Sequence, residues 1–376
     1  MSTKLIDKEQ KEFNFDDISI TVVSNPSLGE NLAKITLIGV GGGGCNMIDN
    51  YCEKNKYKIK IIAANTDSQV LNESIAPVKI QLGIKTTKGL GAGMNPIVGE
   101  TAAEESSRDI MEQLSESDMV FICAGLGGGT GSGAIPVISR ITKELGILCI
   151  AVVTMPFEFE IGREVIADEA LKRLKQHVDS YIVIYNDKIL DIVSKQTGME
   201  ESFKIIDDVL FDTVHSICEM ILQYQRKNIN IDFADISTTL TKKGRALIGI
   251  GNKNGVDAGL NALKEAIESP LLNIESINRS QSILIHIKSH PNYPIHEMKL
   301  LMNYIKTNSD LGTKCIVGTV WDNSMKEDEV KITLIATGFD MEDKKSLASE
   351  LKIEKVTQTK HETKIEKLTK WFLRHI

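Results

Sequence analysis

Leu126-Gly-Gly-Gly-Thr-Gly-Ser-Gly-Ala134 is the stretch of sequence that decides the fold of this chain. It lies between a strand-like apolar run at residues 119–124 and a helix-like stretch at residues 135–145. So many glycines cost backbone entropy, but they let the main chain approach a bound group closely. Unpaired N–H groups and the helix dipole both favour an anion at a helix N-terminus. The order strand, glycine loop, helix therefore predicts a phosphate site and disfavours the alternative of a flexible surface linker.

Two further glycine-rich segments follow apolar runs. Gly39-Val-Gly-Gly-Gly-Gly-Cys-Asn46 fits the Gly-x-Gly-x-x-Gly pattern of dinucleotide folds, and Asn65-Thr-Asp67 follows the second run, where such folds carry an acid for the ribose. The third segment is Lys88-Gly-Leu-Gly-Ala-Gly93. A dinucleotide site uses one such loop, whereas three suit a triphosphate held by successive backbone N–H nests. No Gly-x-x-x-x-Gly-Lys-Ser/Thr occurs, so a P-loop NTPase is excluded.

Apolar runs alternate with amphipathic segments over the first half of the chain. Short runs predict strands buried on both faces at residues 34–40, 59–64, 119–124, 147–154 and 181–185. Amphipathic segments predict helices at residues 100–114 and 163–177. This alternation indicates an α/β fold with a parallel sheet covered by helices.

The second half of the chain has a different pattern. A long apolar-faced helix is predicted at residues 202–225. Strands follow at residues 245–250, 282–288, 314–320 and 330–337, with helices at residues 257–268 and 294–306. We therefore expect a second, smaller α+β domain beyond the long helix.

Composition restricts the class of function. The chain has 376 residues, and its 44 basic against 51 acidic residues give a net charge of −7 with 5% aromatic residues, which argues against direct nucleic-acid binding. The six cysteines form no Cys-x-x-Cys pair and the seven histidines no metal-ligand pattern, so reduced cysteines and no protein-built metal centre are expected. The charged start and the short apolar runs predict a cytoplasmic protein without membrane insertion.

These stretches together resemble the tubulin/FtsZ family of GTPases, in particular its bacterial cell-division members, over about residues 34–340. The loop at residues 127–133 fits the tubulin signature. The other matching stretches, in order along the chain, are residues 39–46, 64–67, 87–93, 95–96, 125–136, 152–157, 177–179, 186–187, 230–235, 269–272, 317–319 and 336–338. The resemblance implies a Rossmann-like GTPase domain joined by a long central helix to a smaller α+β domain. It also implies that GTP is hydrolysed to GDP and phosphate with Mg²⁺.

The predicted division of the chain follows from both arguments. It comprises a flexible extension at residues 1–33, a GTP-binding domain at 34–200, a central helix at 201–229, a C-terminal α+β domain at 230–340 and a charged tail at 341–376.

The resemblance assigns roles around GTP to individual residues. Main-chain contacts to phosphate are implied for Gly41, Gly42, Gly43, Gly44, Gly127, Gly128, Gly129, Thr130 and Gly131, with Asn46 fixing the first loop. Ala92 and Gly93 would close over the γ-phosphate, and Asn65 and Asp67 would lie near the phosphates and the hydrated Mg²⁺. Glu160 and Arg163 are implied at the ribose, and Asn186, Asp207 and a stacked Phe203 at the base. A carboxylate suits guanine because it accepts from both N1–H and N2–H. Without the resemblance, Phe203 and Asp207 would be interpreted as ordinary packing and a solvated acid.

Asn230-Ile-Asp-Phe-Ala-Asp235 would supply the catalytic groups. By itself, Asp235 before Ile-Ser-Thr-Thr predicts an N-cap or turn residue. The resemblance instead implies that this loop enters the nucleotide pocket of the next subunit, where Asp232 and Asp235, with Asn230, orient or activate the attacking water. Hydrolysis would then be activated by self-assembly. Because a head-to-tail contact is heterologous, it repeats into an open filament.

Expected partners are therefore other copies of the chain in the filament of the bacterial division ring at mid-cell. The tail ends in Trp371-Phe-Leu-Arg374, and apolar residues before and within this peptide fit one face of a short helix. We expect this peptide to bind division proteins and membrane tethers.

Two alternative functions remain open at this point. An NAD-dependent Rossmann oxidoreductase could use residues 39–44, but it leaves the glycine loops at Gly89 and Gly127 unexplained. A tubulin-like structural protein could bind GTP without hydrolysing it, and the presence of Asp232 and Asp235 argues against this.

Overall fold

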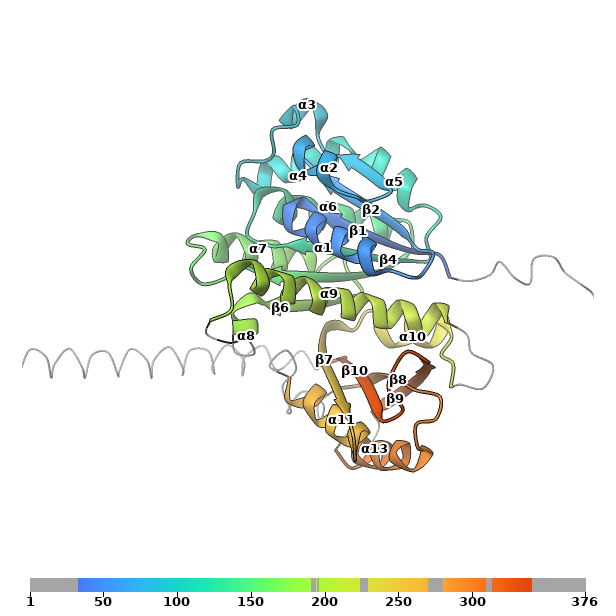
Figure 1. Cartoon of the computed structure of the whole chain (residues 1–376). Coiled ribbons are helices and arrows are strands. Elements are labelled where there is room, and N and C mark those ends of the chain that lie inside the picture. The colour runs from blue at the N-terminus through green and yellow to red at the C-terminus, as the bar shows by residue number, and fades with distance from the viewer. Residues whose placement is uncertain are drawn as a thin grey trace, which may run out of the picture. The chain divides into compact units, whose positions relative to one another are not determined.

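A ten-stranded sheet with the order β3-β2-β1-β4-β5-β6-β7-β10-β8-β9 organises the chain (Figure 1). The computed structural model describes residues 33–190, 194, 196–223, 229–269, 280–308 and 313–339. The predicted tail, and the predicted N-terminal extension except for residue 33, lie outside the described residues.

The first six strands are parallel and confirm the predicted α/β class. They are β1 Ile35–Val40, β2 Lys60–Asn65, β3 Val78–Gln81, β4 Met119–Gly125, β5 Leu148–Met155 and β6 Ser180–Tyr185. Five of them lie within two residues of the predicted runs, whereas β3 had no predicted bounds. In the register of the sheet Gly39 pairs with both Ala63 and Cys123, so β1, β2 and β4 end at the same edge.

Helices cover both faces of this parallel part. They are α1 Gly41–Lys54, α2 Ser68–Glu73, α3 Ile84–Thr87, α4 Pro96–Glu105, α5 Ser107–Leu114, α6 Gly129–Glu144, α7 Arg163–Leu174 and α8 Asn186–Leu190. The predicted helix at residues 100–114 is wrong in extent, because it is two helices that meet at Ser106. The Ser106 hydroxyl bonds to residues outside both helices: it accepts from Gly83 N–H at 3.0 Å and donates to Gln81 C=O at 3.4 Å.

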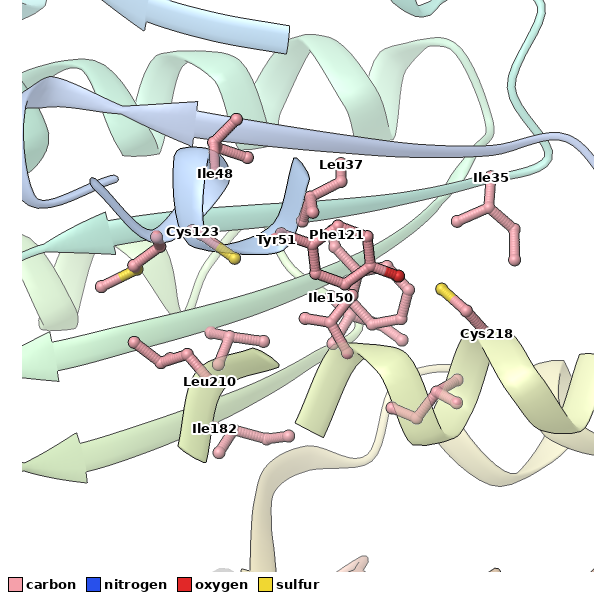
Figure 2. Packing of buried hydrophobic residues seen from close by; sticks show 14 of the residues in the cluster. Ile35, Leu37, Ile48, Tyr51, Phe121, Cys123, Ile150, Ile182, Leu210 and Cys218 are labelled. Atoms are coloured by element: carbon pink, nitrogen blue, oxygen red, sulfur yellow. The ribbon is translucent and has the colours of Figure 1, made fainter. Parts of the chain in front are cut away.

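The long helix α9 spans Met199–Leu222, three residues earlier than predicted at each end. Figure 2 shows how it packs: Leu210 and Cys218 of α9 face Tyr51 of α1 and Phe121 of β4. The helices α1 and α9 share this core on one face of the sheet, and α4, α5, α6 and α7 share the core on the other face. Both clusters are almost fully excluded from solvent, so the sheet is buried on both sides as parallel sheets require.

The remaining elements continue the same sheet. They are α10 Phe233–Leu240, β7 Gly244–Asn254, α11 Ala258–Glu268, β8 Ser282–Ser289, α13 Ile295–Asn308, β9 Lys314–Trp321 and β10 Glu329–Thr337. β7 joins β6 in parallel through Ser180–Gly244, and β10 lies antiparallel between β7 and β8. The sequence did not indicate this continuity, because the bridge from β6 to β7 involves few residue pairs with no distinctive pattern.

Candidate functional site

Two glycine-rich helix N-termini lie side by side at the carboxyl ends of β1 and β4. Most of the glycines predicted to form loops lie in the first turns of α1 and α6 themselves, and Gly128 is the N-cap of α6. The helix α6 therefore begins six residues before the predicted start at residue 135. A Cβ atom on Gly41 would lie 2.8 Å from Gly131 N, and one on Gly43 would lie 3.4 Å from Gly125 Cα. Such approach distances show that the two predicted phosphate segments are in contact.

Most of these glycines are required by the packing of the chain. A Cβ on Gly44 would lie 2.6 Å from the Cys123 carbonyl oxygen, and one on Gly131 would lie 2.5 Å from the Gly125 carbonyl oxygen. On Gly133 it would lie 2.0 Å from the Pro96 carbonyl oxygen. Real Cβ atoms do not come this close to main-chain atoms. The Gly-x-Gly-x-x-Gly pattern at residues 39–44 is therefore explained in part by helix-against-strand packing.

Gly42 and Gly128 have a different reason to be glycine. A Cβ on either would meet no atom within 4 Å among the described residues. Gly128 has φ −96° and ψ 175°, and Gly42 does not have a positive φ, so an alanine would fit both backbones. The N-cap residues of α1 and α6, Val40 and Gly128, make no side-chain capping hydrogen bond, so the first N–H groups of both helices lack the cap that usually satisfies them. This cradle suits an anion that comes close to the main chain.

The second and third predicted segments are bound to one another. Ser68 N–H donates to Gly89 C=O at 3.0 Å, and Gly91 N–H donates to Thr66 C=O at 3.4 Å. Asp67 caps α2 by accepting from Gln69 N–H at 2.8 Å, and the buried Asn65 accepts from Asp67 N–H at 3.2 Å. The third segment thus closes over the end of β2.

Ala92 connects the third segment to α6. It is buried, and a Cβ on Gly129 would lie 2.9 Å from Ala92 Cβ. Gly93 has open space around it, but its φ of +56° is a separate reason for glycine. The sequence argument did not single out Thr66, whose hydroxyl oxygen lies 2.6 Å from Thr130 Oγ1. The only feature of the sequence that could have indicated a role for Thr66 was its position between Asn65 and Asp67.

Aromatic side chains gather around Phe157, which follows Pro156, and a Cβ on Gly127 would lie 3.3 Å from Pro156 Cγ. Phe203 lies edge-on to Phe157 with ring centroids 5.4 Å apart, and Phe157 stacks on Phe159 at 4.9 Å. Phe203 is 41% exposed, so one part of its ring is available for stacking. Glu160 pairs with Arg163 at 3.0 Å and accepts from Phe157 N–H at 3.0 Å.

Asn186 and Asp207, both expected at the base, lie in unusual environments. Asn186 is buried at the end of β6, and its Oδ1 has no hydrogen-bond partner among the described residues. Burial and the neighbouring Asp208 carboxylate raise the pKa of Asp207 to about 6, against the opposing effect of Lys54. Asn186 Oδ1 is therefore an acceptor that a ligand donor could satisfy.

Contacts between α1 and α9 show how these two helices are oriented relative to each other. Asn50 and Lys54 of α1 bind Asp208, and Tyr57, just beyond α1, donates to Glu219 at 2.9 Å. The two helices therefore run in the same direction, and the glycine end of α1 lies toward the Phe203–Asp207 end of α9. Asn46 is exposed on α1, and its predicted role stays a prediction.

The predicted catalytic acids lie at the other end of α9. Asp207 and Leu222 are 15 positions apart, which is about 22 Å along a helix, and Asp232 comes after that end (Figure 1). Asp232, rather than Asp235, is the N-cap of α10, because its Oδ1 accepts from Asp235 N–H at 2.8 Å. The N-cap interpretation of Asp235 is therefore wrong. A single chain does not bring Asn230, Asp232 or Asp235 to the glycine cradle.

Comparisons with known proteins agree with this arrangement. The GTPase-domain model of the tubulin/FtsZ family matches residues 34–194, and the C-terminal-domain model of the FtsZ family matches residues 244–340. The chain is 39% identical over 331 residues to "Cell division protein FtsZ" of Neisseria gonorrhoeae, which covers 88% of this chain and 84% of the relative. The chain belongs to the tubulin/FtsZ family. The resemblance inferred from the sequence is thereby confirmed.

Solved structures of tubulin/FtsZ-family proteins have the same fold as this chain. An empty FtsZ dimer of M. jannaschii superposes with a TM-score of 0.77 at 38% identity, over 83% of this chain and 90% of that chain. CetZ2 of Haloferax volcanii, a GTPgS-bound protofilament, has a TM-score of 0.70 at 18% identity over 87% of this chain and 99% of that chain, and it shows the fold alone. The matched GTPase domain contains all three glycine-bearing segments. No helix among the described residues is both long and apolar enough to cross a membrane.

Proposed function

We propose that this chain is a GTPase that assembles head-to-tail into the filaments of the bacterial division ring at mid-cell. The observation that carries the proposal is the separation of two half-sites. An uncapped glycine cradle lies at one end of α9, and the acids that would complete it lie at the other end. Such halves meet only between successive copies. The relatives named for cell division, and the dimer among the solved structures, support this assignment.

In the proposed complex the α1 and α6 N-termini bind the phosphates through main-chain N–H groups. Gly42 and Gly128 leave room for the phosphate oxygens, and Ala92 and Gly93 cover the terminal phosphate. Asp207 accepts from guanine N1–H and N2–H, Asn186 Oδ1 accepts a further donor, and Phe203 stacks on the base. Glu160 and Arg163 contact the ribose.

Mg²⁺ fits the residues present. It usually keeps several waters and binds one or two carboxylates together with substrate phosphates. No group of three or more His, Cys, Asp or Glu in the described part of the chain could hold a metal ion alone. Asp67, whose Oδ2 would lie 3.7 Å from a Cβ on Gly91, would hold a water of the hydrated ion. The ion would neutralise charge on the phosphates.

Hydrolysis in the proposed filament depends on the neighbouring copy. Asp232 and Asp235, with Asn230, would enter the cradle below and hold a water in line with the terminal phosphate, where positioning supplies most of the catalysis. Asp235→Ala should leave GTP binding near normal while hydrolysis collapses. An equal loss of binding would show that the acid is structural.

GTP hydrolysis measured against protein concentration, with light scattering recorded in parallel, tests the whole proposal. Joint onset above a critical concentration is expected. Assembly without turnover would favour the structural alternative. Absence of both would remove the proposal, although the family match already leaves the oxidoreductase without support.

The tail peptide Trp371-Phe-Leu-Arg374 lies outside the described residues, and its binding to division proteins and membrane tethers stays a proposal from the sequence. Deletion of residues 365–376 should abolish tether binding. Unchanged binding after this deletion would contradict the assignment.

A further inference from the structure

Thr66 is the residue through which the end of β2, the first turn of α6 and residues 87–91 meet. Its side chain is fully buried at the end of β2, and its Oγ1 lies 2.6 Å from Oγ1 of Thr130 in the first turn of α6. Its carbonyl oxygen accepts from Thr87 Oγ1 at 3.2 Å and from Gly91 N–H at 3.4 Å. One residue thus joins the end of β2, the first turn of α6 and the segment that covers the cradle.

The direction of the Thr66–Thr130 hydrogen bond follows from burial. A buried hydroxyl that does not donate its hydrogen loses a hydrogen bond that water would have supplied. Among the described residues, Thr130 Oγ1 is the recorded partner of Thr66 Oγ1. We infer that Thr66 donates and Thr130 accepts, which leaves the Thr130 hydrogen to be donated elsewhere.

Thr130 differs in this respect from hydroxyls deeper in the helices. Thr142 and Ser139 of α6 each donate to the carbonyl four residues earlier, at 2.8 Å, and Thr213 of α9 does the same at 2.7 Å. Thr130 is the second residue of α6, so the carbonyl four residues earlier precedes the helix. Thr130 is also only partly buried, so its hydrogen can be given to a ligand oxygen.

We propose that Thr66 is a positioning residue that makes the site prefer a triphosphate. Its hydroxyl turns the Thr130 hydrogen toward a phosphate oxygen, and its carbonyl holds the covering segment in place above the same group. This inference rests on the proposed function, because it assumes that the covering segment meets the terminal phosphate. Loss of the hydroxyl should therefore weaken triphosphate binding more than diphosphate binding.

The test compares the dissociation constants of GTPγS and GDP for the full chain, at protein concentrations below assembly. Thr66→Val removes the hydroxyl at nearly constant volume and should weaken GTPγS binding about fivefold, which corresponds to one lost hydrogen bond, with GDP binding changed less than twofold. Thr66→Ser retains the hydroxyl and should restore the preference. Wild-type protein that fails to bind either nucleotide would refute the proposed function itself.

The matched control is Thr36→Val. Thr36 is equally buried, and its Oγ1 lies 2.7 Å from Ser117 Oγ near the amino end of β1, away from the cradle. This variant loses a hydroxyl pair of the same kind and should keep the wild-type ratio of the two dissociation constants. An unchanged ratio in Thr66→Val, or an equal shift in both control and variant, would overturn the inference.

Thr87→Val provides a second approach if Thr66→Val does not fold. It removes the hydroxyl that lies 3.0 Å from the Gly83 carbonyl oxygen and 3.2 Å from the Thr66 carbonyl oxygen and that accepts from Gly89 N–H at 3.4 Å. The change therefore loosens the covering segment without altering Thr66. A selective loss of GTPγS binding is expected again. A fully folded Thr87→Val with wild-type selectivity would contradict the role of the Thr66 carbonyl.

Discussion

Gly42→Ala and Gly128→Ala separate ligand binding from folding more sharply than any other change in this chain. An added Cβ meets no atom within 4 Å at either position, and neither backbone conformation excludes alanine. Without nucleotide, the free energy of unfolding should stay within about 1 kcal/mol of wild type: alanine is favoured over glycine by about that amount inside a helix, where Gly42 lies, and is disfavoured by a similar amount at an N-cap, where Gly128 lies. Gly133→Ala, by contrast, places a Cβ 2.0 Å from the Pro96 carbonyl oxygen and should disrupt α6.

The two variants should differ from wild type in how far added nucleotide raises the free energy of unfolding. A ligand at 100 times its dissociation constant stabilises a protein by about 2.7 kcal/mol. If a phosphate oxygen enters the open space beside Gly42 or Gly128, a methyl group placed in that space must stay about 3.5 Å from it and so displaces it. If the methyl weakens binding tenfold, the stabilisation at the same GTP concentration falls to about 1.4 kcal/mol.

Thermal or denaturant unfolding with and without GTP measures both the free energy of unfolding of the nucleotide-free protein and its increase on GTP binding. Gly198→Ala is the matched control, because Gly198 also has open surroundings and an ordinary φ of −68° but precedes α9 rather than the phosphate helices. It should retain the full stabilisation by GTP. A Gly42→Ala protein that is stabilised by GTP as much as wild type would refute the idea that the first turn of α1 touches the phosphates.

Three further predictions concern charge and backbone strain. The pKa of Asp207 is raised from 3.8 to about 6, and in the proposed site only its ionised form accepts from guanine. GTP affinity measured from pH 5 to 8 should therefore be constant above about pH 7 and fall with each pH unit below 6. Asp207→Asn should remove this pH dependence. Glu219 is buried with Lys288 at 3.0 Å and His286 at 3.4 Å, so Glu219→Ala should lower the free energy of unfolding by about 3 kcal/mol in a denaturant titration; a change under 1 kcal/mol would contradict it. Lys88 has φ +53° at the end of α3, so Lys88→Gly should raise stability to thermal unfolding by about 1 kcal/mol, and a loss of stability would show that the Lys88 side chain contributes more than the strain.

The sequence predicted the buried strands of the parallel part and the glycine segments that follow them. Strands of the parallel part have a simple signal, because both faces are buried and each run is continuously apolar. The glycine segments were predicted to bind phosphate, and the structure brings them together at one sheet edge. Their start as helical turns was not predicted, since glycine disfavours helix interiors and only the contact with neighbouring backbone makes it necessary at Gly44 and Gly131.

What the sequence could not supply are relations between distant residues. Ser106 ends α4 because Gly83 and Gln81, more than 20 residues earlier, offer it hydrogen-bond partners. Thr66 and Thr130 are ordinary threonines until β1 lies between β2 and β4 in the sheet and their hydroxyl groups come within 2.6 Å.

The placement of the two acids is the strongest case of such a relation. Residues 230–235 follow α9 in sequence, and α9 is long enough to carry them about 22 Å or more beyond the Asp207 end. Had α9 been a short helix, the same acids could have reached the cradle of their own chain, and the proposed hydrolysis would need no neighbour. In the proposed function, the length of one helix therefore divides the catalytic groups between two half-sites. A protein built in this way can join its turnover of nucleotide to its assembly without any additional regulatory element.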